Sequence, residues 1–226
     1  SCGNSWLALA ASWWAHRNRL PLVRELTSMN EHPYNRTWVR PFIRASLRWA
    51  ALIVPVSPYL AEACNRYGLG DRVQVRSNPV DADRFFPVSD EEKYRERERL
   101  FSISIKSDAV LMVSVGHICP WKNQKFLVGV LDRLPGNYHL IMIGPVLLQD
   151  QEYLDGILSD AKRRDLLHRL HVLDGHYPDV ERYLWASDLL VHASTSEGLA
   201  TAILEGLMCG LPAVVHLISG VTDAVI

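Results

Sequence analysis

The feature that most constrains the fold is a regular alternation of short apolar runs and longer patterned segments between residues 109 and 216. The apolar runs are rich in Val, Leu and Ile and have the length of strands that are buried on both faces. Strands that alternate with helices form parallel sheets with helices on both faces, so the sequence predicts an α/β fold here. The predicted strands are 109–115, 138–143, 170–174, 188–192 and 212–216, and the predicted helices are 123–134, 150–164, 179–187 and 199–209.

The front part of the chain repeats this alternation with shorter elements. Ser57 followed by Pro58 is typical of a helix start, because serine caps the first turn and proline fits the first helical position. Gly68 is typical of the end of the same helix. The stretch 28–35 is polar and lacks periodicity, which indicates a loop. The predicted elements are the helices 5–17, 38–50 and 58–67 and the strands 21–27, 51–56 and 72–76.

A charged, arginine-rich stretch, residues 89–107, separates the two patterned regions. Such a change in composition is typical of a domain boundary. We therefore predict an N-terminal α/β domain at 1–88, a linker at 89–107 and a C-terminal α/β domain at 108–226. The chain begins without Met and enters a helical pattern at once, so we expect a fragment that has been cut at its start and its end.

Composition excludes several classes of protein. A hydrophobic share of 48%, a charged share of 22% and a net charge of −1 are ordinary for a soluble protein and give no overall nucleic-acid signal. No apolar run approaches the ~20 residues that span a bilayer. The four cysteines lack paired spacing, which argues against a disulfide framework or a zinc site and favours a reducing, cytoplasmic compartment.

The stretch from 194 to 212 is the strongest candidate for chemistry. Glu197 precedes a predicted helix and Glu205 lies two turns inside it. At ~1.5 Å of rise per residue, the two carboxylates lie roughly 12 Å apart. Between them are the free N–H groups of a helix start, which suit an anion. This layout fits a nucleotide sugar; the alternative is an ordinary strand–helix unit with two solvated glutamates.

The same residues resemble a known family. Ser194-x-x-Glu197-Gly198, the second Glu eight positions on and Gly210-Leu211-Pro212 are similar to the signature of family 4 retaining glycosyltransferases of the GT-B fold. Three further passages resemble that family in order: Asn78–Asp81 with Phe86-Pro87, Gly116–Asn123, and Tyr183–Asp188. The resemblance implies two Rossmann-like parallel-sheet domains. The chain lacks the family's N-terminal glycine-rich loop, so the N-terminal domain is expected to be incomplete.

The activity that the resemblance implies is transfer of a sugar from a nucleoside-diphosphate sugar to a glycan, lipid-linked or other hydroxyl acceptor, as in polysaccharide biosynthesis. Negative charge grows on the leaving diphosphate, and a positioned cation stabilises it. We expect Lys122 to be this cation and Glu197 to hold the donor sugar at the reaction centre. His117 stands where the family has an arginine, and an imidazole lacks the bidentate guanidinium fork.

The remaining donor contacts are expected at the carboxyl ends of the predicted strands, where ligands of such sheets bind. Gly116, Gly144 and Gly175 fall there, and backbone groups around His176 are candidates for the base. The resemblance implies that Glu205 binds the ribose, because a carboxylate accepts from two vicinal hydroxyls. The N–H groups of Gly198, Leu199 and Ala200 are expected to donate to the diphosphate. No cofactor and no metal site are expected.

The acceptor side is less defined. Glu25, near the end of the predicted strand 21–27, lies where the family has groups that face the cleft; an ordinary strand residue is an equal alternative. Arg36, Arg40, Arg44 and Arg48 form a basic stripe near aromatic residues, which suits peripheral contact with an anionic membrane at its inner face or, alternatively, a solvated helix face.

Two other functions stay open at this point. A sugar-nucleotide epimerase on the same architecture needs the same carboxylates and the same diphosphate site but no acceptor. A non-catalytic nucleotide-sugar-binding module is the other alternative, because His117 replaces the family's arginine and the glycine-rich loop is missing.

Overall fold

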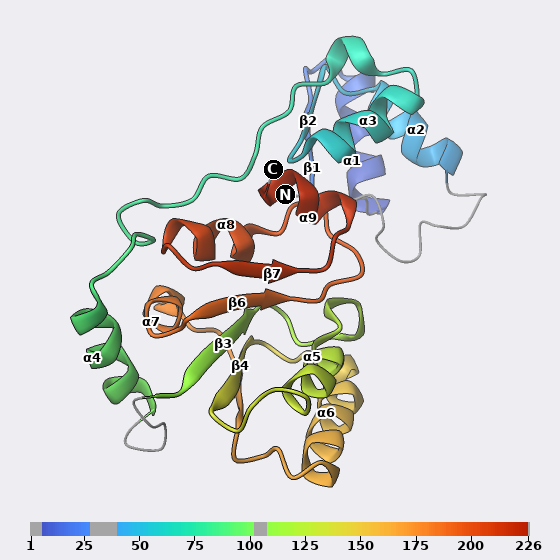
Figure 1. The fold of residues 1–226 in the computed structure, drawn as a ribbon. Coiled ribbons are helices and arrows are strands. Elements are labelled where there is room, and N and C mark those ends of the chain that lie inside the picture. Colours follow the sequence, from blue (N-terminus) through green and yellow to red (C-terminus); the bar gives the residue numbers. More distant parts are fainter. Residues whose placement is uncertain (1–5, 28–39, 102–107, 226) are drawn as a thin grey trace. The chain divides into compact units, whose positions relative to one another are not determined.

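A computed structural model describes residues 6–27, 40–101 and 108–225 of the protein (Figure 1). The chain divides into two compact units. The first unit comprises Ser1–Pro79, Ser196–Ala200 and Ile218–Ile226, and the second comprises Val80–Thr195 and Thr201–Leu217. The sequence pattern put the first boundary at residue 88 and did not separate the segments 196–200 and 218–226 from their neighbours.

A five-stranded sheet organises the second unit. Its order is β5-β4-β3-β6-β7 and each pairing is parallel. The strands are β3 Val110–Val115, β4 Tyr138–Gly144, β5 Leu170–Asp174, β6 Leu189–His192 and β7 Ala213–Val215. The predicted parallel α/β fold is thus confirmed. The chain moves outward from β3 to β5 and then returns to the other side of β3, so the switch in strand order lies between β3 and β6, where such sheets bind ligands.

Helices cover both faces of this sheet (Figure 1). The pair α5 and α6 packs on one face, and α7 with α4 lies on the other. The helical elements of this unit are α4 Asp90–Phe101, η2 Pro120–Lys122, α5 Gln124–Leu131, η3 Leu148–Asp150, α6 Gln151–Arg163, α7 Val180–Trp185 and α8 Thr201–Met208.

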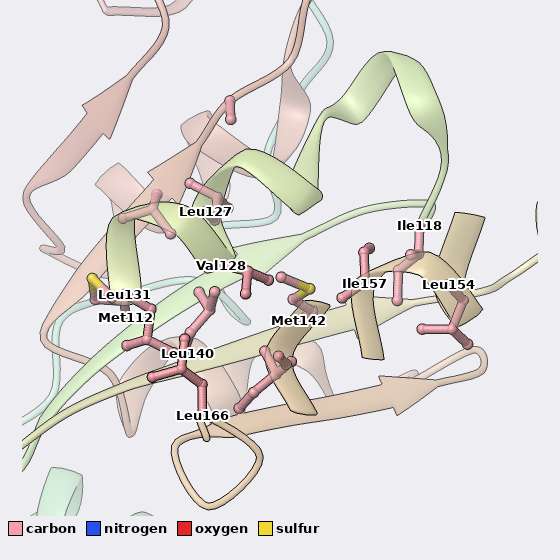
Figure 2. Close-up of a cluster of buried hydrophobic side chains, with 14 residues drawn as sticks. Met112, Ile118, Leu127, Val128, Leu131, Leu140, Met142, Leu154, Ile157 and Leu166 are labelled. Atoms are coloured by element: carbon pink, nitrogen blue, oxygen red, sulfur yellow. The ribbon is translucent and has the colours of Figure 1, made fainter. Parts of the chain in front are cut away.

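The core of the second unit lies between the sheet and the pair α5 and α6 (Figure 2). Alternate residues of β4, Leu140 and Met142, point into it and are fully buried. They meet Val128 of α5 and Ile157 of α6, which are also fully buried. Each such side chain stabilises the fold by about 1.5–3 kcal/mol through burial. This packing fixes the strand ends that carry the candidate site.

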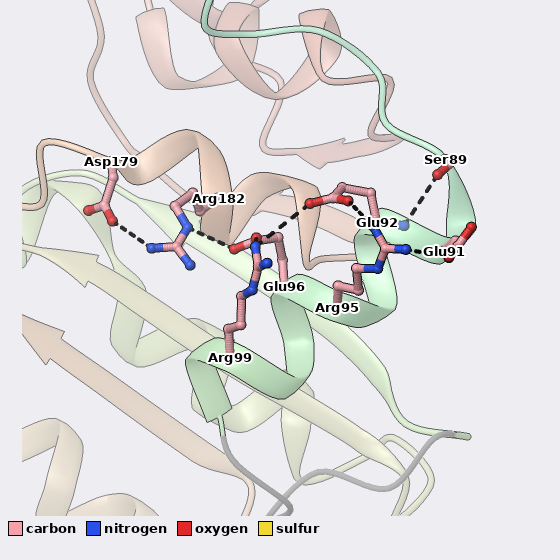
Figure 3. A network of polar contacts seen from close by, with 8 residues as sticks. All are labelled: Ser89, Glu91, Glu92, Arg95, Glu96, Arg99, Asp179 and Arg182. Atoms are coloured by element: carbon pink, nitrogen blue, oxygen red, sulfur yellow. Dashed lines mark hydrogen bonds and ion pairs between the residues drawn. The ribbon is translucent and has the colours of Figure 1, made fainter.

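Residues 90–101 of the expected linker form α4, which ion pairs attach to the second unit. Arg182 of α7 donates to Glu96 at 2.7 Å, and Arg99 donates to the same carboxylate at 2.6 Å (Figure 3). Arg97 is buried and binds the carbonyl oxygen of Ala186 and the carboxylate of Asp188. The high charge that suggested a linker reflects these partners, which come from distant parts of the sequence.

The first unit holds a two-stranded parallel sheet of β1 Val23–Leu26 and β2 Leu52–Pro55. Ser57 caps α3 as expected, accepting a hydrogen bond from Leu60 N at 3.4 Å. Residues 72–76 do not form the predicted strand. They donate two backbone hydrogen bonds to β2, but their side chains are mostly exposed, so little packing holds the segment in the sheet. The helical elements of this unit are α1 Trp6–Arg17, α2 Arg40–Arg48, α3 Pro58–Arg66, η1 Gly70–Arg72 and α9 Ser219–Val225.

Candidate functional site

Two glycines let the carboxyl ends of β3 and β4 approach each other. Gly116 and Gly144 have φ of 135° and 151°, which residues with a side chain rarely adopt. A Cβ at Gly144 would collide with the carbonyl oxygen of Gly116. A Cβ at Gly116 would lie 3.7 Å from Lys122 Nζ, so the ammonium group lies directly beside this strand end. The structure therefore brings three predicted site residues together: Gly116, Gly144 and Lys122.

Hydrogen bonds to the segment after β6 hold the loop that carries Lys122. The carbonyl oxygen of Trp121 accepts from Thr195 N at 2.8 Å, Thr195 Oγ1 at 3.1 Å and Ser194 Oγ at 3.2 Å. Asn123 follows in the left-handed conformation, with φ 55°, and ends the short helix η2. These contacts fix Lys122 between β3 and β6, the two strands at the switch in strand order.

His117 follows Gly116 and lies against a buried carboxylate. Its Nε2 is 3.1 Å from Oδ2 of Asp150, whose side chain is 7% exposed. The orientation is not that of a hydrogen bond, and neither atom has a hydrogen-bond partner within the described part of the chain. Gln124 Nε2 donates to the carbonyl oxygen of His117 at 2.8 Å, and the Trp121 ring packs edge-on against the imidazole. No local sequence pattern marks Asp150 as a partner of His117.

Gly175 ends β5 beside the other two strand ends. It donates to the carbonyl oxygen of Gly144 at 3.3 Å and has φ 144°. Asp174 Oδ1 accepts from Val146 N at 2.8 Å, which joins this strand end to the loop after β4. His176 follows and is exposed. The three predicted glycines therefore lie on three neighbouring strands at one edge of the sheet.

Glu205 lies on α8 and is partly buried, with the positive charge of Arg84 and the negative charge of Glu181 nearby. Burial raises the pKa of its carboxyl group, the positive charge of Arg84 lowers it, and the negative charge of Glu181 raises it. Arg84 donates to Glu181 and, at 2.5 Å, to the carbonyl oxygen of Pro178. Sequence reasoning missed Arg84 and Glu181, although Arg84 lies within the passage 78–87 that carries the family resemblance.

Glu197 and the residues after it belong to the first unit. The segment Ser196–Ala200 clusters with that unit, whereas Lys122 and Glu205 belong to the second. Gly198 has no room for a side chain, because a Cβ would collide with the carbonyl oxygen of Thr27. Leu199 and Ala200 are buried and precede α8, which begins at Thr201, two residues later than predicted. The separation of Glu197 from Glu205 stays a prediction.

Within the described ranges, no group of three or more His, Cys, Asp and Glu side chains is arranged to hold a metal ion. None of the helices in those ranges is long and apolar enough to cross a membrane. A pocket of about 280 Å³ lies between α5 and the ends of β6 and β7, but none of the predicted site residues lines it.

Comparison with known proteins connects this geometry to a family. The family model for glycosyl transferases group 1 matches residues 96–226. The UDP-Gal:alpha-D-GlcNAc-diphosphoundecaprenol alpha-1,3-galactosyltransferase of Escherichia coli is 26% identical over 149 residues, which are 66% of this chain and 38% of that protein. The chain therefore spans well under half the length of this curated relative.

Solved structures give the fold of the relatives. Anabaena Alr3699/HepE in complex with UDP and glucose has a TM-score of 0.81 and 23% identity, with 94% of this chain and 57% of that chain covered. The sucrose-phosphate synthase from Thermosynechococcus elongatus has a TM-score of 0.74 and 19% identity, with 92% and 54% covered. These neighbours are GT-B glycosyltransferases, which confirms the expected GT-B-like fold.

The sequence motifs, the parallel sheet and the matched family model agree with one another. The family model covers more than half of the 226 residues, including α5, α8 and the five strands of the larger sheet. The chain belongs to the glycosyl transferases group 1 family.

Proposed function

We propose that the protein transfers a glycosyl group from a nucleoside-diphosphate sugar to a hydroxyl acceptor, with retention of the anomeric configuration. The observation that carries this proposal is the ammonium group of Lys122 beside Gly116, at the switch in strand order of the larger sheet. Backbone N–H groups and a fixed cation at such an edge suit a diphosphate.

The reaction breaks the bond between the anomeric carbon and the diphosphate oxygen. Negative charge grows on that oxygen, and Lys122 stabilises it without having to move into place. The acceptor hydroxyl approaches the same face, forms the new bond to the anomeric carbon and gives its proton to the departing phosphate. The products are a glycoside and a nucleoside diphosphate, and no protein nucleophile, cofactor or metal ion is required.

The nucleoside is proposed to lie toward β5 and α8. Glu205 accepts hydrogen bonds from the two ribose hydroxyls, and the backbone around Gly175 and His176 meets the base. Glu197, with the N–H groups of Gly198, Leu199 and Ala200, is proposed to hold the donor sugar and the diphosphate. The partly buried environment of Glu205 supports its role, because a carboxylate shielded from water binds hydroxyl groups more strongly.

Uridine is the base that the relatives support. The Anabaena protein was solved in complex with UDP and glucose, and the Escherichia coli relative is named for a UDP-galactose donor. The same relative is named for an acceptor linked to diphosphoundecaprenol. We therefore propose a UDP-sugar donor and a lipid-linked acceptor for this protein.

A lipid-linked acceptor would require contact with a membrane surface. Trp13 and Trp14 of α1 are 52% and 56% exposed, and Phe42 of α2 is 47% exposed. Arg44 and Arg48 lie on α2 close to Phe42 in sequence, and Arg36 of the predicted stripe lies outside the described residues. Aromatic and basic side chains on neighbouring helices support peripheral binding to anionic lipid.

Calorimetric titration with UDP tests the donor site. Lys122→Ala should weaken UDP binding by about 1.5–3 kcal/mol, because it removes a charged hydrogen-bond donor. Lys125→Ala is the matched control, since Lys125 is an exposed lysine three residues on. Equal UDP affinities for the two variants would remove Lys122 from the site.

A radiolabelled UDP-sugar then tests the reaction. Label that appears in a lipid-linked acceptor supports transfer. Label that appears in a different UDP-sugar without any acceptor would identify an epimerase instead, and UDP-sugar binding without any turnover would identify a binding module.

A further inference from the structure

We propose that Arg84 is a positioning residue that directs the carboxylate of Glu205 toward the ribose, and that Glu181 holds Arg84 in place for this role. The inference rests on the proposed function and deepens it, because it names two residues outside the nucleotide contacts on which the ribose contact depends. All three residues belong to the second unit.

The first observation is that the loop before α4 binds along one face of α7. Arg84 of this loop donates from Nη2 to the carbonyl oxygen of Pro178 at 2.5 Å and to the carboxylate of Glu181, whose side chain is 15% exposed. Two residues later, the carbonyl oxygen of Phe86 accepts from Trp185 Nε1 at 2.9 Å, and the centroids of the two rings lie 5.1 Å apart. Glu181 and Trp185 are one turn apart on α7, so they share one face of it.

The second observation is that the same loop contacts α8. A Cβ at Gly210, just past the end of α8, would lie 3.4 Å from Cβ of Pro87. Burial raises the pKa of the Cys209 thiol to about 11, and a hydrogen bond with the backbone of Phe86 opposes this rise. The N–H group of Cys209 donates to the carbonyl oxygen of Glu205 at 3.0 Å, so the two side chains are one turn apart on the same face of α8.

The register of the two helices brings their glutamates to the same part of the loop. Both α7 and α8 lead back from the carboxyl edge of one parallel sheet, so they run in the same direction. Trp185 of α7 and Cys209 of α8 both meet Phe86. One turn nearer the carboxyl edge, where such sheets bind ligands, the matching positions are Glu181 and Glu205.

Arg84 is the cation that acts on both carboxylates. Burial raises the pKa of Glu205, the positive charge of Arg84 lowers it, and the negative charge of Glu181 raises it. The hydrogen bond with Glu181 raises the pKa of Arg84 most, and the charge of Glu205 adds to that rise. Within the described residues, the charged and titratable groups that act on Glu205 are thus Arg84, Glu181 and, on its own helix, Cys209. Arg84, fixed by Glu181, attracts the second carboxylate and orients it in the ionised form that accepts from hydroxyl groups.

Two ligands that differ only in the ribose test the role of Arg84. UDP and 2′,3′-dideoxyuridine diphosphate carry the same base and the same diphosphate, so the ratio of their affinities reports the hydroxyl contacts alone. Calorimetry should show that Arg84→Ala lowers this ratio about tenfold by weakening UDP binding, with the affinity for the dideoxy ligand unchanged. Adding Arg84→Ala to Glu205→Gln should lower the ratio no further, because the carboxylate through which Arg84 acts is gone.

The pH dependence of the same ratio separates an effect of charge from a loss of packing. The ionised carboxylate of Glu205 accepts from both hydroxyls, so the ratio should fall as pH decreases through the pKa of Glu205. Arg84→Ala should move this fall to higher pH, whereas Arg84→Lys, which keeps the positive charge, should leave it close to that of the unaltered protein. Glu181→Gln should move the fall to lower pH, because the charge of Glu181 raises the pKa. The titration of the diphosphate itself is common to both ligands and cancels in the ratio.

Arg164→Ala is the matched control. Arg164 pairs with Asp132 at 2.6 Å and so joins two elements, as Arg84 does, but it lies at the end of α6 on the other face of the sheet. Its UDP affinity, ligand ratio and pH profile should match those of the unaltered protein. Circular dichroism checks that each variant folds, and Arg84→Gln replaces Arg84→Ala if the latter does not.

Four outcomes would overturn the inference. An unaltered ratio and pH profile in Arg84→Ala would remove Arg84 from this role, and so would equal losses of affinity for the two ligands, which would place its effect away from the ribose. In both cases the unaltered protein still binds UDP, so the proposed function stands. Equal affinities of the unaltered protein for the two ligands would overturn the ribose contact of Glu205 and this inference with it. Absence of UDP binding by the unaltered protein would overturn the proposed function as well.

Discussion

The residues of the candidate site differ in how their environments prepare them for a ligand. Lys122 lies beside a strand end where a glycine leaves space, and its loop is held through the carbonyl oxygen of Trp121. Glu205 lies in a partly buried position, where burial raises the pKa of its carboxyl group. Because their neighbours differ, single substitutions can separate the proposed diphosphate contact of Lys122 from the proposed ribose contact of Glu205.

Glu205→Gln tests the nucleoside side of the site. The substitution keeps the size of the side chain but removes its charge, so UDP affinity should fall by about 1.5–3 kcal/mol, the usual range for a charged hydrogen bond. Affinity for inorganic pyrophosphate should stay the same, because that ligand has no ribose. Glu152→Gln on the exposed surface of α6 is the control. Equal losses for UDP and pyrophosphate would contradict a ribose contact.

At the scale of elements, the larger sheet and α4 are held in different ways. The sheet is fixed by apolar packing against α5 and α6 (Figure 2). The helix α4 carries charged side chains that pair with the rest of the unit, such as Glu96 with Arg182 of α7 (Figure 3). Its Arg97, which is 7% exposed, pairs with Asp188. A buried charged contact is costly to break from one side, because the remaining charge is left without its partner.

Arg97→Ala tests the attachment of α4. The variant leaves the carbonyl oxygens of Ala186 and Ala109 without the guanidinium, whereas Asp188 keeps its ion pair with Lys93, so the free energy of unfolding should fall by about 1–3 kcal/mol. Arg95→Ala, on the same helix with a side chain that is 54% exposed, should cost about 0–1 kcal/mol. Urea unfolding followed by circular dichroism measures both variants. A similar small loss for the two would mean that the Arg97 contacts contribute little.

At the scale of the whole molecule, a histidine pair links stability to pH. His139 of β4 and His171 of β5 stack with their ring nitrogens 3.2 Å apart. Burial first, and nearby basic side chains second, lower the pKa of His139 from 6.5 to about 4, and burial lowers the pKa of His171 as well. Between about pH 4 and pH 6.5, the unfolded chain therefore binds more protons than the folded chain.

The free energy of unfolding should consequently fall as pH decreases from about 6.5 toward about 4, in line with proton linkage. His139→Phe keeps a planar ring without a titratable nitrogen and should flatten this dependence. His168→Gln, at an exposed position two residues before β5, should change it far less, because His168 contributes least among the groups that lower the pKa of His139. Urea unfolding at a series of pH values measures the slope, and an unaltered slope in His139→Phe would remove the pair as its cause.

The sequence alone determined the parallel α/β fold of the larger unit, the strands that end in glycine and the family. These features follow from local patterns: runs of Val, Leu and Ile have the period of buried strands, and a glycine after such a run marks a close approach or an unusual φ. Because Gly116, Gly144 and Gly175 each follow a predicted strand, parallel pairing alone was enough to bring them to one edge.

Only the tertiary structure decided which distant side chains meet. Asp150 lies 33 positions from His117 and Arg97 lies 91 positions from Asp188, so no local pattern could pair them. The same holds for α4, whose charges indicated a linker although they have partners on α7. Periodicity reports the environment of an element, whereas the pairing of buried charges depends on strand order and on which helices cover which face of the sheet.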